Sequence, residues 1–497
     1  VGTMSSMAEI PGVGYLEGAS GNNLSADSDS PEEIVAGLIR DNTTPGEYVL
    51  YPKPHEINYT NQALDLSDGV SIYYEDGVDE YTKARLELDL EENKIGHSET
   101  DNINQSGATL LLGIYGSGQA VDQLASGIAD ASLFQKTDAY LIETKDNKIT
   151  ILGKDADSVY YGVSTFRQML EQRGNGNILY GVKIRDYSDI AFRGFIEGYY
   201  GDPWSLEDRV ELMKFGGDYK MNQYIYAPKD DPYHNSKWRE LYPDSELPKI
   251  EQLAQAGNES KCSFVFAIHP FMNKPFNFNN YEADLATLEA RYTQAIEHGV
   301  RSIAILEDDA AGSSAQNLSR LLNDLHEYLL EMKKTYPDLK TTILYCPTDY
   351  MNDGSSQKLK TINANVGDYI NIMMTGGRVW GEVSPSFGKN FKSNITSDGA
   401  PGRAPYMWIN WPCSDNSKQH LIMGGYSTFL HPGINPADYQ GIVLNPMQQS
   451  EPSKVAIFGN ADFSWNVWKN KEEAEATWLD SFNFVDHGTI YENGASA

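Results

Sequence analysis

From residue 193 onward, short apolar runs alternate with longer stretches in which apolar residues recur every three to four positions. The short runs are typical of buried strands, and the longer periodicity is typical of amphipathic helices. Eight strands are predicted, at 193–197, 221–227, 263–269, 302–306, 341–346, 369–374, 405–410 and 441–444. Helices are predicted between several of them, at 206–219, 247–257, 281–298 and 315–336. This alternation over about 260 residues predicts a (β/α)8 barrel.

Ahead of the barrel, the pattern predicts a small α/β domain over residues 46–188. Its strands are predicted at 70–74, 109–114, 139–144 and 148–152. A helix is predicted at 155–172, because apolar residues follow a 3.6-residue period there. Residues 186–189 are interpreted as the linker into the barrel, which spans 189–468. The predicted fold class is therefore α/β.

The two ends of the chain differ from this pattern. Residues 1–45 are rich in Gly, Ser, Asn and Asp and predict a linker or irregular segment, with room for a short helix at 31–40. Residues 469–497 predict the start of a helical C-terminal region, with one helix at 472–484. The opening Val1-Gly2-Thr3-Met4 is typical of an expression scar and carries no signal-peptide pattern, which is consistent with removal of a targeting segment.

Composition excludes several classes of partner. Acids outnumber bases by 70 to 39, for a formal charge of -31, which argues against nucleic acids and anionic membranes. No apolar run approaches the roughly 18 to 20 residues of a membrane span, so no membrane insertion is expected. The three cysteines, Cys262, Cys346 and Cys413, are far apart and predict no disulfide framework. No His, Cys and Glu residues have metal-ligand spacing, so no metal or other cofactor is predicted.

The strand at 302–306 is followed closely by two adjacent acids, Asp308 and Asp309. The carboxyl ends of barrel strands are where such folds carry their chemistry. Neighbouring like charges resist joint ionisation, so one carboxyl is expected to hold a proton while the other is charged. An acid beside an anion suits the cleavage of a glycosidic bond. The alternative is structural, since Asp is also favoured at a helix N-cap and in the first helical turn.

Other chemically useful side chains follow the remaining predicted strands. They are Gly198 and Tyr200 after the first strand, Lys229 after the second, Cys346 and Tyr350 at the fifth, Trp408, Asn410 and Asp415 at the seventh, and Asn445 after the eighth. Singly, each has a structural alternative: a glycine or Asn445 can serve a turn, Lys229 can be a solvated charge, and Trp408 can be core. Their convergence on one barrel mouth favours a polar cleft with an aromatic wall, which suits a sugar ring.

Three of these segments resemble glycoside hydrolase family 84. They are Phe-Ile-Glu-Gly-Tyr-Tyr-Gly at 195–201, Tyr-Ile-Tyr-Ala-Pro-Lys-Asp-Asp-Pro-Tyr-His at 224–234, and the acid pair at 308–309. The resemblance extends over about residues 48–468 and includes the small N-terminal domain, which opens on Tyr-Pro-Lys-Pro at 51–54. That domain is shared with the family 20 hexosaminidases, which typically carry Asp-Glu where this chain has Asp-Asp. Family 84 holds β-N-acetylglucosaminidases, including the O-GlcNAcases and clostridial enzymes called hyaluronidases.

The resemblance implies a retaining exo-β-N-acetylglucosaminidase that acts by substrate-assisted catalysis. The 2-acetamido oxygen of the substrate would attack its own anomeric carbon and form an oxazoline intermediate. By motif position, Asp308 would orient and polarise the acetamide N–H. Asp309 would protonate the leaving oxygen and then deprotonate the incoming water.

The resemblance also implies a set of substrate-binding residues. Tyr350 would bond near the acetamide, and Trp408, Cys346 and Tyr200 would line its pocket. The Gly198 carbonyl, Lys229, Asn410, Asp415 and Asn445 would hold the sugar hydroxyls and the acetamide. The segment 384–403 is interpreted as a long loop near the aglycone side.

The expected partner is a glycan or glycoprotein that carries β-linked GlcNAc, and the expected location is secreted or at the cell surface of a bacterium. Two alternatives stay open. An endo-acting hyaluronidase is disfavoured by the charge of -31, because hyaluronan is anionic. A non-catalytic glycan-binding protein would bind a chromogenic β-N-acetylglucosaminide without cleaving it.

Overall fold

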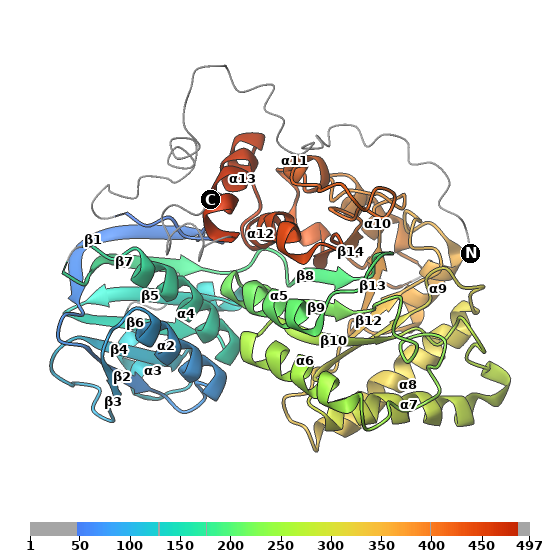
Figure 1. Cartoon of the computed structure of the whole chain (residues 1–497), viewed down its shortest axis with the longest axis horizontal. Helices are drawn as coiled ribbons and strands as arrows, with labels where there is room; N and C mark the ends of the chain where they lie inside the picture. The colour runs from blue at the N-terminus through green and yellow to red at the C-terminus, as the bar shows by residue number, and fades with distance from the viewer. Residues whose placement is uncertain (1–46, 128–129, 175, 398, 486–497) are drawn as a thin grey trace.

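The computed structural model has two lobes, an N-terminal sheet and a larger barrel, with helices α11 to α13 lying over one edge of the barrel (Figure 1). It describes residues 47–127, 130–174, 176–397 and 399–485. The irregular segment predicted at 1–45 and its short helix at 31–40 lie outside these residues. The fold class is α/β, as the sequence predicts.

The N-terminal lobe is built on a seven-stranded mixed sheet in the order β1-β7-β5-β6-β4-β2-β3. The strands are β1 (Glu56–Asp65), β2 (Val70–Tyr74), β3 (His97–Glu99), β4 (Thr109–Ile114), β5 (Tyr140–Lys145), β6 (Lys148–Gly153) and β7 (Ile178–Asp186). β2 and β4 are where the sequence predicts them, and β5 and β6 differ by one residue at their ends. β7 includes Asp186, so the linker into the barrel begins one residue later than predicted.

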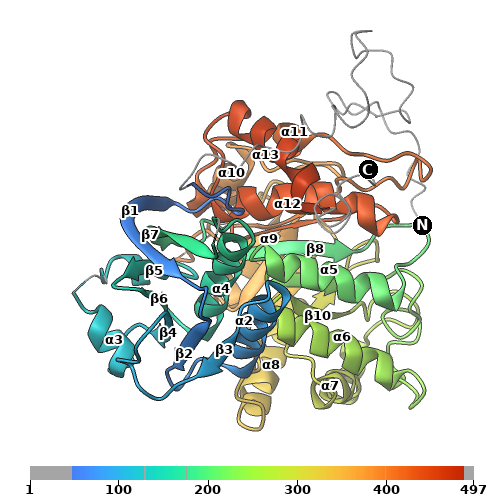
Figure 2. The same ribbon diagram turned by 60° about the vertical axis from the view of Figure 1, so that its left-hand side comes forward.

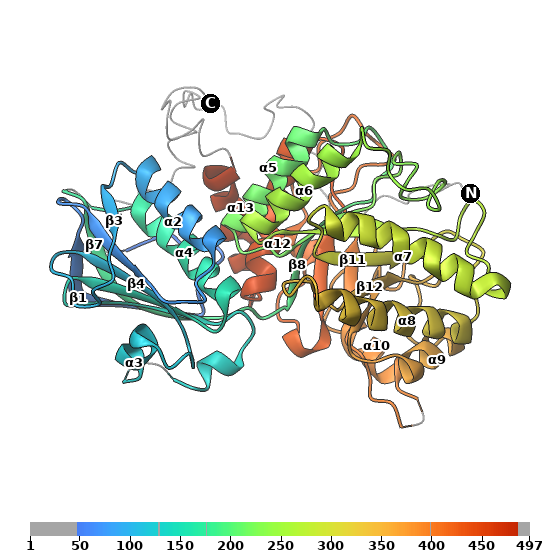
Figure 3. The ribbon, with the colours of Figure 1, turned by 90° about the horizontal axis from the view of Figure 1, so that it is seen from below.

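Helices cover both faces of this sheet (Figure 3). α2 (Glu80–Glu92) and α4 (Ala156–Glu171) lie on one face, where Leu86 and Phe166 are fully buried. α3 (Ala120–Ala125) and the short 3-10 helix η1 (Leu133–Gln135) contribute Val121 and Leu133 to a smaller core on the other face. Both faces of the sheet are therefore covered by helices of the same lobe.

The second lobe is a closed barrel of eight parallel strands in the order β10-β11-β12-β13-β14-β15-β8-β9. The strands are β8 (Phe192–Glu197), β9 (Gln223–Tyr226), β10 (Ser263–Ile268), β11 (Ser302–Leu306), β12 (Ile343–Cys346), β13 (Ile370–Met374), β14 (Tyr406–Ile409) and β15 (Gly441–Leu444). All eight predicted strands are confirmed, with ends that differ by at most two residues. Residues buried on both faces of a parallel sheet read as continuous apolar runs, which is why the sequence reveals these strands.

Helices follow the strands around the outside of the barrel (Figure 2). They are α5 (Leu206–Asp218), α6 (Leu247–Ser260), η2 (Phe278–Asn280), α7 (Tyr281–Glu297), α8 (Ala315–Lys333), α9 (Gln357–Asn365), α10 (Phe387–Ile395), α11 (Tyr426–Phe429), η3 (Pro436–Asp438) and α12 (Ser450–Trp465). The interpretation of 384–403 as one long loop is wrong, because α10 occupies its middle. Phe391 and Ile395 of α10 are fully buried, and this packing holds the segment against the barrel.

The two lobes are joined by the end of α12 and by α13 (Lys471–Val485). Trp465 is fully buried in the core of the N-terminal lobe, and its indole N–H donates to Asp186 at 2.9 Å. The Tyr51 hydroxyl, from the start of that lobe, donates to Asp480 of α13. α13 also packs along α12 and α11, so the helix predicted at 472–484 lies against the barrel.

Candidate active site

The loop after β11 is held in place by a buried acid. Glu307 is fully buried, and its carboxylate accepts hydrogen bonds from the Tyr345 hydroxyl (2.8 Å), the Lys358 ammonium (2.9 Å) and the Ser313 N–H (2.9 Å). Its own N–H donates to the Cys346 carbonyl at 2.8 Å, which continues the pairing of β11 with β12. Glu307 is thus a structural anchor that fixes the chain next to the acid pair.

Asp308 and Asp309 face one pocket although they are consecutive. In an extended strand, successive side chains point to opposite faces. The chain leaves that conformation at Asp309, whose φ of 58° lies in the left-handed region. Asp is one of the few residues besides Gly that enter this region at moderate cost. The turn therefore brings two neighbouring carboxylates to the same side.

Asp308 is a buried carboxylate beside a cation. Its Oδ2 lies 3.7 Å from the Lys229 ammonium, and the side chain is 7% exposed. Burial raises the pKa of Asp308, but the charge of Lys229, helped by His269 and His234, outweighs it and holds the pKa below its usual value. Among the described residues, Asp308 Oδ1 has no hydrogen-bond partner. The group is an anion with unused acceptor capacity.

His269 fixes the peptide that carries the pair. Its Nε2 lies 2.6 Å from the Asp308 carbonyl oxygen and 3.7 Å from Asp308 Oδ1. Because a carbonyl only accepts, this nitrogen carries the proton. His269 directly follows β10, and the sequence interpretation did not include it.

Asp309 accepts a hydrogen bond from the Tyr350 hydroxyl at 2.8 Å. Burial and the bond to Asp309 raise the pKa of Tyr350, so the phenol stays protonated and donates. The structural alternative for the acids is wrong, because α8 begins at Ala315 and its N-cap is Ser314, whose hydroxyl accepts from the Asn317 N–H. Neither aspartate caps the helix.

A chain of amides crosses the floor of the site. The Asn410 side-chain oxygen accepts from the Trp408 indole N–H (2.9 Å) and from the Asn445 amide (3.0 Å). The Asn445 oxygen in turn accepts from the Gly198 N–H at 3.2 Å. A Cβ on Gly198 would lie 2.8 Å from the indole, so only glycine fits there. Asn445 is therefore bonded within the site and does not serve only to form a turn. The same contacts fix the plane of the Trp408 ring.

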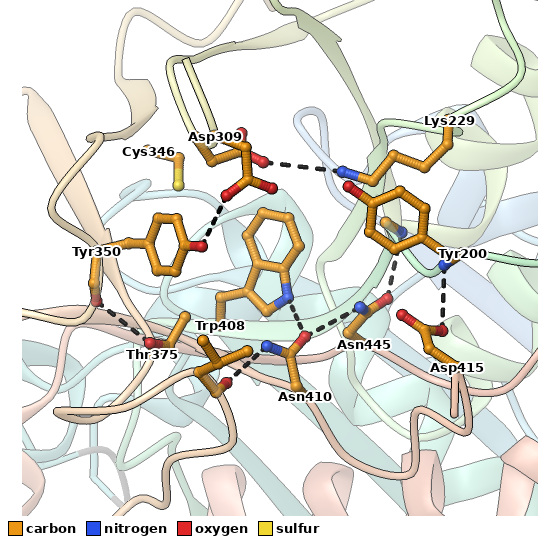
Figure 4. A pocket seen from close by; sticks show the side chains of 13 residues that line it. Tyr200, Lys229, Asp309, Cys346, Tyr350, Thr375, Trp408, Asn410, Asp415 and Asn445 are labelled. Atoms are coloured by element: carbon orange, nitrogen blue, oxygen red, sulfur yellow. Dashed lines mark hydrogen bonds and ion pairs between the residues drawn. The ribbon is translucent and has the colours of Figure 1, made fainter. Parts of the chain in front are cut away.

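Asp415 lies across the site from Asp309, as Figure 4 shows. Its Oδ1 accepts from the Tyr200 N–H at 3.1 Å. Burial raises the pKa of Asp415 above its usual value. The Lys229 ammonium lies 5.0 Å from the centre of the Tyr200 ring, so this lysine is engaged on both sides rather than solvated in a loop.

The pocket brings together all of the predicted site residues. They are Gly198, Tyr200, Lys229, Asp308, Asp309, Cys346, Tyr350, Trp408, Asn410, Asp415 and Asn445. The space between the lining atoms is about 400 Å³, with its solvent-open part included. Thr375 and Val379 also line it and were missed. The Val379 carbonyl accepts from the Asn410 amide at 2.7 Å.

Two prominent acids of the motifs have other roles. Glu197 is buried in an ion pair with Arg209 (2.7 Å) and accepts from the Tyr224 hydroxyl at 2.6 Å. Asp231 accepts from the hydroxyls of Tyr226 (2.8 Å) and Tyr242 (2.7 Å).

In the described ranges, no group of His, Cys, Asp and Glu residues is arranged to hold a metal ion. Within the same ranges, no helix combines the length and apolarity that crossing a membrane requires.

Barrels of this kind carry their chemistry at the carboxyl ends of the strands, and paired carboxylates at that end are the groups that cleave glycosidic bonds. Fold and site together define a glycoside hydrolase of the α/β-barrel class. Residues 193–496 match the family model described as beta-N-acetylglucosaminidase, and residues 47–187 match the model of glycosyl hydrolase family 20, domain 2. The chain belongs to this β-N-acetylglucosaminidase family, glycoside hydrolase family 84.

The chain is also similar to individual proteins. It is 31% identical to the Protein O-GlcNAcase of Mus musculus over 284 residues, which are 53% of this chain and 29% of the mouse protein. Among solved structures it is similar to CpGH84D, with 37% identity, a TM-score of 0.82 and coverage of 90% of this chain and 74% of that one. For CpGH84B the values are 30%, 0.75, 90% and 76%. The chain thus spans less than a third of the length of the mouse relative.

Proposed function

We propose that this protein is a retaining β-N-acetylglucosaminidase that removes terminal β-linked GlcNAc from glycans or glycoproteins by substrate-assisted catalysis. One observation carries the proposal. Both carboxylates near the reacting end of the pocket come from consecutive residues, whose Cα atoms are about 3.8 Å apart. Retaining enzymes with their own nucleophile place two carboxylates on opposite sides of the anomeric carbon. A pair on one side leaves the nucleophile to the substrate.

Asp308 is the group that activates this nucleophile. It is ionised, because Lys229 keeps its pKa low, and its Oδ1 has acceptor capacity left among the described residues. It accepts the acetamide N–H, which turns the acetamide oxygen toward C1 and stabilises the positive charge that develops as the oxazoline forms. Cys346 and Trp408, both nearly fully buried, enclose the acetamide methyl.

Asp309 is the general acid and then the general base. It protonates the glycosidic oxygen in the first step and takes a proton from water in the second. The Tyr350 hydroxyl, at 2.8 Å, orients this carboxyl toward the reacting centre. At the far end, the Asp415 carboxylate accepts hydrogen bonds from the sugar hydroxyls, and the Asn445 amide donates one. Action on a terminal residue is supported by Asp415, which closes the pocket opposite the acids.

The test compares aryl β-N-acetylglucosaminide with aryl β-glucoside. Only the acetamide supplies the internal nucleophile, and losing such a nucleophile costs up to about 7 to 11 kcal/mol. We expect turnover of the first substrate, no measurable turnover of the second, and tight inhibition by a thiazoline that mimics the oxazoline. Comparable rates on both glycosides would overturn the mechanism.

A second series separates acetamide participation from simple recognition of the acetamide. Substrates with mono-, di- and trifluorinated acetamides keep the shape of the group but have a progressively weaker nucleophile. We expect kcat to fall steadily along the series. A rate that ignores fluorination would point to an enzyme nucleophile, and binding without cleavage would point to a glycan-binding protein.

A further inference from the structure

The two aspartates of the site share one rigid peptide unit. A peptide bond is planar, so only the dihedrals on either side of it rotate. Turning the plane between Asp308 and Asp309 changes ψ of the first residue and φ of the second together. The orientation of this single plane therefore sets the direction of both carboxylates.

The plane is held in an orientation that a free chain avoids. The φ of 58° at Asp309 lies in the left-handed region, which is disfavoured for a residue with a Cβ. Such a conformation persists only where the surrounding structure enforces it. If the plane relaxed, the Asp309 carboxylate would turn away from the Tyr350 hydroxyl, which donates to it at 2.8 Å.

His269 supplies a hydrogen bond that holds the plane. Its Nε2 donates to the Asp308 carbonyl oxygen at 2.6 Å, and the residue is 3% exposed, so the bond is shielded from water. The other ring nitrogen, Nδ1, accepts from the Phe271 N–H at 3.4 Å. A nitrogen that accepts carries no proton, so both contacts require the same tautomer, with the proton on Nε2. The imidazole is therefore fixed at both of its nitrogens.

The backbone of His269 is held by the segment at 224–234, which the sequence analysis singled out. The His269 N–H donates to the carbonyl of His234, the last residue of that segment, at 2.8 Å. His234 Nδ1 donates to the Ala267 carbonyl at 2.7 Å. These two bonds clasp the loop after β9 to the end of β10. Because β10 pairs with both β9 and β11, they aim the imidazole at the loop that follows β11.

The segment is in turn anchored by its own acid. The Asp231 carboxylate accepts from the Tyr233 N–H at 2.8 Å, and its carbonyl accepts from the His234 N–H at 3.1 Å. Asp231 and His234 are both buried. A buried row of contacts therefore runs from Asp231 through His234 and His269 to the peptide between the two catalytic acids.

We propose that His269 is a positioning residue for the general acid and base. It holds the peptide plane between Asp308 and Asp309 so that the Asp309 carboxyl meets the glycosidic oxygen. The inference rests on the proposed function, which assigns the roles of the two acids. His269 does not line the pocket, so it acts on the substrate only through these acids.

A matched pair of variants isolates the hydrogen bond. In His269→Gln, the side-chain nitrogen is the same number of bonds from Cα as Nε2, so a donor for the Asp308 carbonyl is kept. His269→Met has the same reach and a similar volume but no donor. His269→Asn is a second variant without the bond, because its amide matches the position of Nδ1 and is too short to reach the carbonyl. Denaturant unfolding shows whether each variant is folded.

The measurement is kcat/KM for aryl β-N-acetylglucosaminides whose leaving groups differ in pKa. A displacement of about 1 Å at a reacting group costs roughly 10²-fold, so we expect losses of this order for poor leaving groups in His269→Met and His269→Asn. Activated leaving groups need less protonation and should lose less, so the plot of rate against leaving-group pKa should steepen. His269→Gln should keep the slope of the wild type.

A role in folding alone would give a different result. A smaller folded fraction lowers every rate by the same factor and leaves the slope unchanged. An unchanged slope in His269→Met and His269→Asn would therefore overturn the proposal, and so would an equal steepening in His269→Gln. In either case the wild type would still cleave these substrates, and the proposed function would stand. If the wild type cleaved none of them, the proposed function itself would be refuted.

Discussion

Each lobe of the molecule has an acid where a parallel strand ends, and the two acids are used in opposite ways. In the N-terminal sheet, Glu75 directly follows β2 and is buried. Its carboxylate accepts four hydrogen bonds, from the N–H groups of Ile114, Val121 and Asp122 and from the Ser117 hydroxyl, at 2.8 to 3.1 Å. Every strong acceptor position is filled, and Glu75 fixes the start of α3.

In the barrel, the residue directly after β11 is Glu307, whose carboxylate is filled in the same way. Asp308, one residue further along, keeps acceptor capacity. It is paired with Lys229 at 3.7 Å, and its Oδ1 makes no hydrogen bond within the described ranges. A buried polar atom without a partner is unfavourable in the folded protein, and because Asp308 Oδ1 faces the pocket, a substrate N–H can complete it. The difference shows that an acid is not functional merely because it lies at a strand end. What distinguishes Asp308 is that one of its oxygens can still accept a hydrogen bond.

The largest effect is expected for Asp309→Asn. Substrates with poor leaving groups need protonation of the glycosidic oxygen, so their kcat/KM should fall by up to about 10⁴-fold, whereas an activated aryl leaving group should lose less in the first step. The measurement is a plot of rate against leaving-group pKa for wild type and variant. An equal loss for all leaving groups would show that Asp309 is not the acid.

The contrast between Glu75 and Asp308 is tested by replacing each carboxylate with the matching amide. Asp308→Asn should lower kcat/KM by about 10²- to 10³-fold for good and poor leaving groups alike, because acetamide attack is needed for both. Its free energy of unfolding should also fall, by up to about 3 kcal/mol, because Lys229 loses a buried partner but is itself 26% exposed.

Glu75→Gln is the matched opposite. Its amide would face N–H donors that need an acceptor, so the free energy of unfolding should fall by about 1 to 3 kcal/mol while kcat/KM is unchanged. The free energy of unfolding is measured by denaturant unfolding and kcat/KM by steady-state kinetics, for both variants. If Asp308→Asn unfolded the protein and left activity intact, the contrast between the two acids would be wrong.

Asp415→Ala is expected to have a smaller effect on catalysis. An ionised carboxylate bonded to sugar hydroxyls contributes about 2 to 3 kcal/mol of transition-state binding, measured through kcat/KM. Asn416→Ala, the exposed neighbour of Asp415 that does not line the pocket, serves as the control. Wild-type kcat/KM in Asp415→Ala would remove this residue from the sugar site.

The smallest effect concerns pH. Burial raises the pKa of Asp415, and Lys229 holds that of Asp308 below its usual value, so acidification protonates Asp415 first. Because only the ionised form accepts two hydroxyl bonds, KM should rise on the acid side before any loss of kcat that depends on Asp308. Asp415→Asn should lack this rise in KM. An unchanged acid limb in that variant would assign the titration to another group.

The sequence revealed the barrel strands because each is a short apolar run, but it missed elements that lack such a signal. β1 is largely exposed at the edge of its sheet, so polar residues interrupt any alternation. α12 is buried on nearly all sides and therefore has no polar face to set its period. Elements of this kind are recognised only once their neighbours are known.

The site was predictable where its residues carry distinctive chemistry. Val379 was missed because it contributes its backbone carbonyl, which no residue type signals. The other missed residues, His269 and Thr375, directly follow β10 and β13, the two strand ends for which no site residue was predicted. Searching all eight ends would have found them. The left-handed turn at Asp309 and the link from Lys229 to Asp308 arise from packing and could not be read from residue type.

The amide chain on the floor of the site also bears on chemical ageing. Asparagine deamidates when the next backbone nitrogen attacks its side chain, and the product, an aspartate, could no longer donate. Asn445 is followed by Pro446, which has no N–H, and Asn410 is followed by Trp411, whose N–H is bonded to the Ile409 carbonyl at 2.8 Å. Both asparagines are therefore protected from deamidation, which would remove the donors of this hydrogen-bonded row of amides. The pocket should keep its shape through long storage.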